Sequence, residues 1–197
     1  MQLVRHRVND VSSLVTLPEH YGVELDLQYS NSEISIGHNP GQISNSFDDY
    51  LRSYKHSLMC LNIKQEGIEE SVIDKLESHN VSHFFLFDLT FPAIMKLIRL
   101  KKNCMALRLS DFESVRDLKY FIGKVQWIWL DTFTDINFIS RKSLEAFEGF
   151  KICLVSPELH TWRSEEFNYE LTRKLLDLDI AFDAVCTKNL DIWQNAK

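Results

Sequence analysis

The sequence predicts an α/β protein, and specifically a compact (β/α)8 TIM-type barrel that forms one domain over residues 1–197. Three observations predict this fold. Eight short runs rich in Val, Ile, Leu and Phe recur along the whole chain. The runs are continuously apolar, as expected of parallel strands that are covered on both faces. Helix-like segments separate the runs, so the chain repeats a strand followed by a helix.

The expected strands lie at residues 3–4, 23–27, 58–63, 84–89, 104–109, 125–130, 152–155 and 182–186. After the second strand, the turn Asn31-Ser32-Glu33 precedes another apolar run, which predicts a hairpin extension that leads to His38. Residues 69–76 and 91–100 place apolar side chains at helical spacing. Ser110 and Ser164 each precede acidic residues, as at a helix N-cap.

The alternative fold is an open, doubly wound sheet. No Gly-rich GxGxxG segment follows a strand, so nothing supports a dinucleotide-binding version of that fold. The 197 residues are enough to bury a core. Because 45% of the residues are hydrophobic and 25% are charged, the chain is neither disordered nor a coiled coil.

Charge and hydropathy limit the partners and the location. The formal net charge is −6 and no basic cluster extends beyond Lys101-Lys102, so we expect no nucleic-acid partner. No apolar stretch approaches the length of a membrane span, and the first residues lack the apolar segment of a secretion signal. We therefore expect a cytoplasmic protein. The four cysteines lie in apolar runs without CxxC spacing, which predicts buried free thiols.

Polar side chains at the ends of the expected strands are the candidates for chemistry, because the reactive groups of such barrels gather at the C-terminal edge. Glu24 and Asp26 are two residues apart, so they share one face of a strand. Two adjacent carboxylates repel each other unless a cation lies between them, and Mg²⁺ or Ca²⁺ prefers oxygen ligands. The alternative is an ordinary strand with one polar face.

The next expected strands carry an amide and two cations. An amide oxygen from Asn62 can complete a metal shell, and Lys64 can hold a phosphate as a point charge. The alternative is a satisfied interior asparagine beside a lysine that reaches solvent. Arg108 ends a buried strand and therefore needs an anion, either a carboxylate such as Asp131 or the phosphate of a ligand.

Two of the seven histidines lie where they could take part in proton transfer. His6-Arg7 ends the first strand, and His38 lies in a loop between glycine and proline residues. Imidazole moves protons near neutral pH, and a guanidinium binds two phosphate oxygens at once. The other five histidines are expected to be polar core or surface residues.

Taken in order, His6-Arg7, Glu24-x-Asp26 and His38 in a His-Asn-Pro turn resemble the glycerophosphodiester phosphodiesterase family, one of the phosphatidylinositol phospholipase C-like barrels. That family has His-Arg on its first strand, Glu-x-Asp on the second, another histidine in the following turn, and Glu-x-Lys on the third strand. The eight-strand repeat extends the resemblance over nearly the whole chain. It implies a single phosphodiesterase-like barrel domain.

The resemblance implies a phosphoric diester hydrolase that acts on a small soluble diester similar to a glycerophosphodiester. His6 and His38 would be the general acid and base, and Arg7 would hold the phosphate, with Lys64 near it. We add Arg108 to the expected substrate-binding residues because it needs an anion.

The resemblance also implies a divalent metal ion, Mg²⁺ or Ca²⁺, held by Glu24, Asp26 and Asn62. Asn62 stands where the family has a metal-binding glutamate, which removes one negative charge and lowers the expected affinity for the cation. Val8-Asn9 replaces the glycine that the family has after His-Arg, so the first loop has a different shape.

Two other functions fit the same residues. The first is a non-catalytic barrel that binds a phosphorylated ligand through Arg7, Lys64 and Arg108. The second is a metal-independent lyase that produces a cyclic phosphate, with arginine and lysine in place of the cation. Because phosphate binding needs neither imidazole, the two histidines favour an enzyme over a binding protein.

Overall fold

The protein is described by a computed structural model that covers residues 1–139, 141–178 and 180–194. Within these ranges the chain is a mixed α/β protein with one sheet of ten strands. Parallel pairing involves β1 (Gln2–Arg5), β2 (Gly22–Ser30), β5 (Met59–Ile63), β6 (Phe84–Phe87), β7 (Ala106–Leu109), β8 (Trp127–Leu130), β9 (Lys151–Val155) and β10 (Ala184–Thr187). Each of these strands overlaps one of the eight predicted runs.

β1 lies between β2 and β10, the last strand of the chain. From β1 the strand numbers rise on one side and fall from β10 on the other. On one side β1 pairs with β2, β2 with β5, and β5 with β6. On the other side β1 pairs with β10, and the pairing continues through β9 and β8 to β7. A single parallel bridge joins Leu86 of β6 to Met105, just before β7. The main-chain amide of Leu86 also donates to the carbonyl of Cys104 (3.0 Å).

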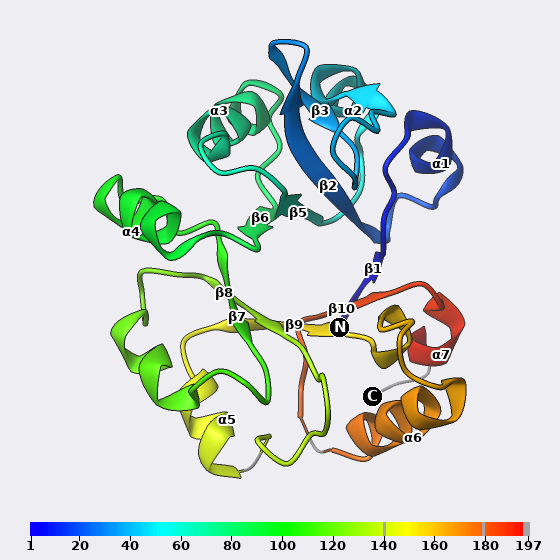
Figure 1. Ribbon diagram of the computed structural model, residues 1–197, viewed down its shortest axis with the longest axis vertical. Coiled ribbons are helices and arrows are strands. Elements are labelled where there is room, and N and C mark those ends of the chain that lie inside the picture. Colours follow the sequence, from blue (N-terminus) through cyan, green and yellow to red (C-terminus); the bar gives the residue numbers. More distant parts are fainter. Residues whose placement is uncertain (140, 179, 195–197) are drawn as a thin grey trace.

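Helices lie around the outside of the strands (Figure 1). They are α1 (Val11–Thr16), α2 (Phe47–Ser53), α3 (Glu69–Ser78), α4 (Phe91–Arg99), α5 (Arg141–Phe147), α6 (Glu165–Leu176) and α7 (Leu190–Gln194), with 3-10 helices η1 (Val115–Tyr120) and η2 (Pro157–Leu159). The predicted helices α3 and α4 are confirmed. In the described part of the chain, no helix has both the length and the apolar character that crossing a membrane requires.

The two predicted helix starts have different outcomes. Ser164 is the N-cap of α6, and its hydroxyl accepts a hydrogen bond from the amide of Phe167 (3.2 Å). The prediction at Ser110 is wrong, because the next helix is η1 and begins only at Val115. The hydroxyl of Ser110 accepts from the amide of Phe112 (3.1 Å), so these residues form a local turn instead of a helix.

The predicted hairpin is confirmed. β2 pairs antiparallel with β3 (Glu33–Ile36), which in turn pairs with β4 (Asn45–Ser46). Asn31 and Ser32 join β2 to β3 with φ angles of 52° and 65°, the left-handed conformation of a tight hairpin turn. The loop between β3 and β4 carries His38.

The two faces of β2 have opposite characters. Val23, Leu25 and Leu27 are buried in a large cluster with residues of the surrounding helices. Glu24 and Asp26 lie on the other face, where Glu24 is in register with Cys60 of β5. Cys60 belongs to an apolar cluster whose other members are Val4, Leu58, Phe85, Phe87, Ala106, Trp127, Trp129, Cys153, Val155, Ala184 and Cys186. The two carboxylates are therefore buried polar groups on a face of β2 that borders this apolar cluster.

All four cysteines are free thiols, as predicted. Cys60, Cys153 and Cys186 are buried, whereas Cys104 is only partly buried.

Candidate functional site

The loop after β1 lies directly against Glu24. The main-chain amide of His6 donates to the carbonyl of Thr187 on β10 (3.0 Å), and the amide of Arg7 donates to Oε2 of Glu24 (2.7 Å). The Nε2 atom of His6 lies 3.7 Å from the same carboxylate oxygen. Arg7 has a φ of 55°, an unusual angle for a residue with a side chain, so surrounding contacts hold this turn in place.

Asp26 is the centre of the polar contacts. Lys64 places its Nζ atom 3.1 Å from Oδ1 of Asp26, and the Nε atom of Arg7 lies 3.8 Å from Oδ2. Asn9 contacts Asp26 twice, because its Nδ2 atom donates to Oδ2 (2.8 Å) and its Oδ1 atom accepts from the Asp26 amide (3.0 Å). Nothing in the sequence marked Asn9 as a site residue, except that Val8-Asn9 replaces the glycine of the family that the sequence resembles.

Asn62 lies opposite Asp26 in the register of β2 and β5. Its Oδ1 atom is buried and has no hydrogen-bond partner among the described residues. A buried unpaired amide oxygen costs free energy unless a ligand or cation approaches it. Within residues 1–139, 141–178 and 180–194, no three His, Cys, Asp or Glu side chains are close enough to share a metal ion.

His38 reaches this group of residues through Arg7. A terminal nitrogen of the Arg7 guanidinium donates to Nε2 of His38, and Nδ1 of His38 lies 2.9 Å from Oδ1 of Asn39. A guanidinium can only donate, so the His38 Nε2 atom accepts, and the proton of the neutral ring is on Nδ1, where Asn39 accepts it. The lone pair of Nε2 therefore points toward Arg7.

A buried glutamine organises the loop that carries His38. The Nε2 atom of Gln28 lies 3.1 Å from the carbonyls of Gly37 and Asn39 and 3.2 Å from that of Gln42. Sequence reasoning missed Gln28 because its partners are 9 to 14 residues away along the chain.

Replacing Gln28 with leucine should lower the free energy of unfolding. The variant keeps a similar volume but leaves the carbonyls of Gly37, Asn39 and Gln42 without this donor, at a cost of about 1–3 kcal/mol. Urea unfolding followed by circular dichroism measures the change. As a control, Gln65→Leu removes an exposed glutamine that accepts one hydrogen bond, from the amide of Tyr29 (3.2 Å), and should shift stability by less than about 1 kcal/mol. Equal effects from the two substitutions would contradict the assigned role of Gln28.

Burial and neighbouring charges shift two pKa values at this site. Burial, aided by the positive charges of Arg7 and Lys188, lowers the pKa of His6 to about 3. Burial, aided by the negative charge of Asp26, raises the pKa of Glu24 to about 8. Both shifts disfavour the charged form, because neither side chain has enough water or counter-charge around it.

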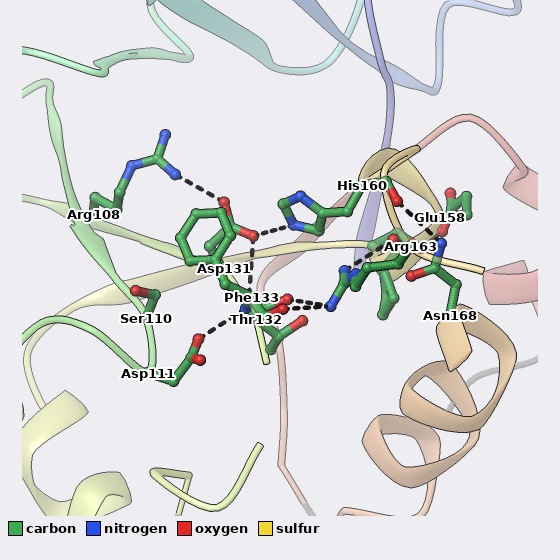
Figure 2. A network of polar contacts seen from close by, with 12 residues as sticks. Arg108, Ser110, Asp111, Asp131, Thr132, Phe133, Glu158, His160, Arg163 and Asn168 are labelled. Atoms are coloured by element: carbon green, nitrogen blue, oxygen red, sulfur yellow. Dashed lines mark hydrogen bonds and ion pairs between the residues drawn. The ribbon is translucent and has the colours of Figure 1, made fainter. Parts of the chain in front are cut away.

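Arg108 belongs to a different polar network (Figure 2). One of its terminal nitrogens donates to Oδ2 of Asp131 (2.8 Å) and the other donates to Asp88. Asp131 also lies 2.6 Å from Nε2 of His160. Arg108 thus forms an internal ion pair, which was one of the two alternatives considered from the sequence. Its binding of substrate stays a prediction. His160, expected to be an ordinary polar residue, unexpectedly joins this network.

Seven of the eight predicted site residues are therefore brought together where β1, β2 and β5 end. They are His6, Arg7, Glu24, Asp26, His38, Asn62 and Lys64. A cavity of about 360 Å³ opens beside His6 and Arg7, with Ser13 and Thr16 of α1 among its lining residues. A joint arrangement of two imidazoles, two carboxylates and two cations can bind a phosphate group and move protons at it.

Comparison with known proteins finds solved structures with a similar fold, although no sequence comparison gives a match. No protein-family model and no curated protein sequence matches the chain. Its structure is similar to that of a glycerophosphodiester phosphodiesterase from Agrobacterium tumefaciens, with a TM-score of 0.71 and 12% identity over 98% of this chain and 99% of that one. It is also similar to a glycerophosphoryl diester phosphodiesterase from Parabacteroides distasonis, with a TM-score of 0.65 and 11% identity over 98% and 85%. The chain therefore has a glycerophosphodiester phosphodiesterase-like fold.

Proposed function

We propose that the protein is a phosphodiesterase whose eight parallel strands close into a small (β/α)8 barrel, with the single bridge at Leu86 and Met105 as the weakest contact of the ring. In such a barrel, the ends of β1, β2 and β5 border one opening. The fold shared with the two solved phosphodiesterases supports this proposal.

One observation carries the functional proposal: Arg7 touches one imidazole and both carboxylates. Its main-chain amide donates to Glu24, and its guanidinium contacts Asp26 and His38. A phosphate could displace His38 and accept hydrogen bonds from the Arg7 guanidinium in its place. The Nε2 lone pair of His38 would then be free to accept a proton. Substrate binding would in this way prepare the proton-transfer group.

The residues fit a divalent cation at the same place. Glu24 and Asp26 supply carboxylate oxygens, and the buried Oδ1 atom of Asn62 has no hydrogen-bond partner among the described residues. All three are hard oxygen donors, which suit Mg²⁺ or Ca²⁺. A cation held there would neutralise the negative charge that develops on the non-bridging oxygens of the phosphate.

In the proposed reaction the chain's own side chains bind the diester and move two protons. Arg7 and Lys64 hold the non-bridging oxygens by charge-assisted hydrogen bonds. One of the imidazoles of His6 and His38 takes a proton from the attacking water, and the other gives a proton to the departing alcohol oxygen. The products are a phosphomonoester and a free alcohol.

The activity is tested with bis(4-nitrophenyl) phosphate and with glycerophosphodiesters, each in the presence of added Mg²⁺, Ca²⁺ or Mn²⁺. We expect turnover that requires the cation, with release of a monoester seen by ³¹P NMR. An absence of turnover on every diester under all of these conditions would overturn the proposal.

One contact favours a second function, a lyase that forms a cyclic phosphate without a metal. The ammonium group of Lys64 already lies 3.1 Å from Oδ1 of Asp26, where it partly takes the place of a cation. The two reactions differ in their first product, because a lyase uses a hydroxyl of the substrate instead of water. A five-membered cyclic phosphate in the ³¹P spectrum, formed in the presence of EDTA, would identify the lyase.

Two substitutions should change the affinity for the cation in opposite directions. Asp26→Asn removes one negative charge and should abolish the rise in melting temperature that Ca²⁺ causes. Asn62→Glu adds a carboxylate opposite Asp26 and should tighten Ca²⁺ binding by on the order of tenfold. Thermal unfolding at increasing Ca²⁺ concentrations measures both effects.

The control for this series is Asp48→Asn. Asp48 is a carboxylate of α2 that pairs with Lys75 of α3, away from the proposed site. A Ca²⁺ response that is the same in Asp26→Asn as in Asp48→Asn would rule out the proposed cation site.

A further inference from the structure

A continuous row of rings lies beside the Asp131 network, on the loops that follow β7, β8 and β9. The ring centroids of Phe112 and Phe133 are 6.1 Å apart, those of Phe133 and His160 are 5.1 Å apart, and those of His160 and Trp162 are 6.0 Å apart. The two ends of the row face solvent, because Phe112 is 74% exposed and Trp162 is 66% exposed. Exposed apolar side chains that form a contiguous group, instead of being scattered singly, mark binding surfaces.

The row lies at the same edge of the sheet as the proposed phosphate site. His6 bonds through its main-chain amide to the carbonyl of Thr187, and the Thr187 hydroxyl donates to Glu158. Glu158 lies in η2, and His160 directly follows that helix. A continuous chain of contacts therefore joins the proposed phosphate site to the row.

Most of the polar groups beneath the row have partners, and the atoms without one among the described residues, such as Thr132 Oγ1 and Arg163 Nε, are buried beyond the reach of a ligand. The Asp131 carboxylate accepts from Arg108 (2.8 Å) and from the amide of Thr132 (3.0 Å), and it lies 2.6 Å from His160. The terminal nitrogens of Arg163 donate to three main-chain carbonyls, two of them on Thr132 and Phe133 (2.8 and 3.1 Å), which ties the β8 loop to the loop after β9 (Figure 2).

The surface of the row therefore offers a ligand few accessible hydrogen-bonding groups, which favours some ligands over others. A sugar or another polyol would bring several hydroxyls to a surface with few free hydrogen-bonding groups, and each unpaired hydroxyl would lose its water. A flat ring needs only one exposed aromatic face, such as that of Trp162, and stacking on it requires no hydrogen-bond partner.

We propose that the row formed by Phe112, Phe133, His160 and Trp162 is the subsite for one alcohol of the diester, and that this alcohol carries a flat, uncharged ring such as a nucleoside base. The inference rests on the proposed phosphodiesterase function and narrows its substrate class. Such a diester is a small molecule, consistent with the expectation that nucleic acid is no partner.

The test compares three esters of glycerol 3-phosphate that differ in the second alcohol: methanol, uridine through its 5′ oxygen, and glucose through its 6 oxygen. We expect kcat/KM for the uridine ester to exceed that for the methyl ester by about tenfold or more, the range of one stacked base. Trp162→Ala should lower kcat/KM for the uridine ester by about tenfold more than kcat/KM for the methyl ester. Tyr169→Ala is the matched control, because Tyr169 is 68% exposed but outside the row.

Three outcomes would overturn the subsite while leaving the phosphodiesterase intact: equal kcat/KM for the uridine and methyl esters, a preference for the glucose ester, or equal losses on all esters in Trp162→Ala. If no ester reacts, the proposed function fails, and the subsite is tested instead by the binding of phosphate monoesters. Uridine 5′-monophosphate should then bind about tenfold more tightly than methyl phosphate in calorimetry, and Trp162→Ala should abolish the difference. Equal affinities of these two ligands would overturn it.

Discussion

Replacing either His6 or His38 with alanine is expected to lower kcat/KM for phosphodiester hydrolysis by on the order of 10²- to 10⁴-fold, the usual contribution of a positioned acid or base. His6 lies 3.7 Å from Glu24 and His38 is bonded to Arg7, so each imidazole borders the proposed phosphate site. Initial rates on bis(4-nitrophenyl) phosphate with a fixed metal concentration measure both losses.

The double variant should be little slower than the worse single variant, because groups that act as one unit give losses that do not add. His83→Ala is the matched control. His83 is exposed and directly precedes β6, at the opposite edge of the sheet from the ends of β1 and β2. A loss of less than about threefold in both His6→Ala and His38→Ala would contradict the acid and base roles, since it is far below that range.

Gly37→Ala should cost nearly as much activity, without touching an imidazole. A Cβ atom at Gly37 would lie 1.8 Å from the carbonyl oxygen of Gln42 and 2.5 Å from Nε2 of Gln28. The main chain of the loop has to move to relieve this overlap, and His38 is the next residue. A displacement of about 1 Å in a catalytic group can cost on the order of 10²-fold in rate.

The control for this substitution lies in the same loop. Gly41 has a φ of 77°, so Gly41→Ala strains the main chain, but its Cβ would meet nothing within 4 Å. We expect Gly41→Ala to lower stability by about 1 kcal/mol while activity on the aryl diester falls much less than in Gly37→Ala. Equal activity in the two variants would show that the geometry around Gln28 does not position His38.

The parallel strands were predictable because each is buried on both faces and therefore reads as a short apolar run. Glu24 and Asp26 could be placed on one face of β2 from the two-residue period alone. The error at Ser110 has a local cause. Its hydroxyl bonds to the amide of Phe112, and the Asp111 carboxylate accepts the amide of Phe133 (2.8 Å) from the next loop. A contact between two loops overrides the helix-start pattern.

The supporting residues of the candidate site were not predictable from the sequence. Asn9 and Gln28 act through main-chain groups of distant residues, and no spacing pattern marks such contacts. His160 also looked ordinary, because its carboxylate partner lies 29 residues earlier in the chain. The sequence thus predicted the groups that the proposed chemistry would use, and the fold shows which side chains contact them.

Histidine NMR tests whether His6 and His38 border one phosphate-binding position, and it does so without requiring the protein to turn over a substrate. With ¹⁵N-labelled histidine and single variants to assign the signals, a methylphosphonate analogue of a glycerophosphodiester is titrated into the protein. We expect the imidazole signals of His6 and His38 to shift together with one dissociation constant. The signal of His83 should not respond, and Arg7→Ala should weaken binding by about tenfold. Saturable binding that leaves both His6 and His38 unshifted would contradict a shared phosphate-binding position.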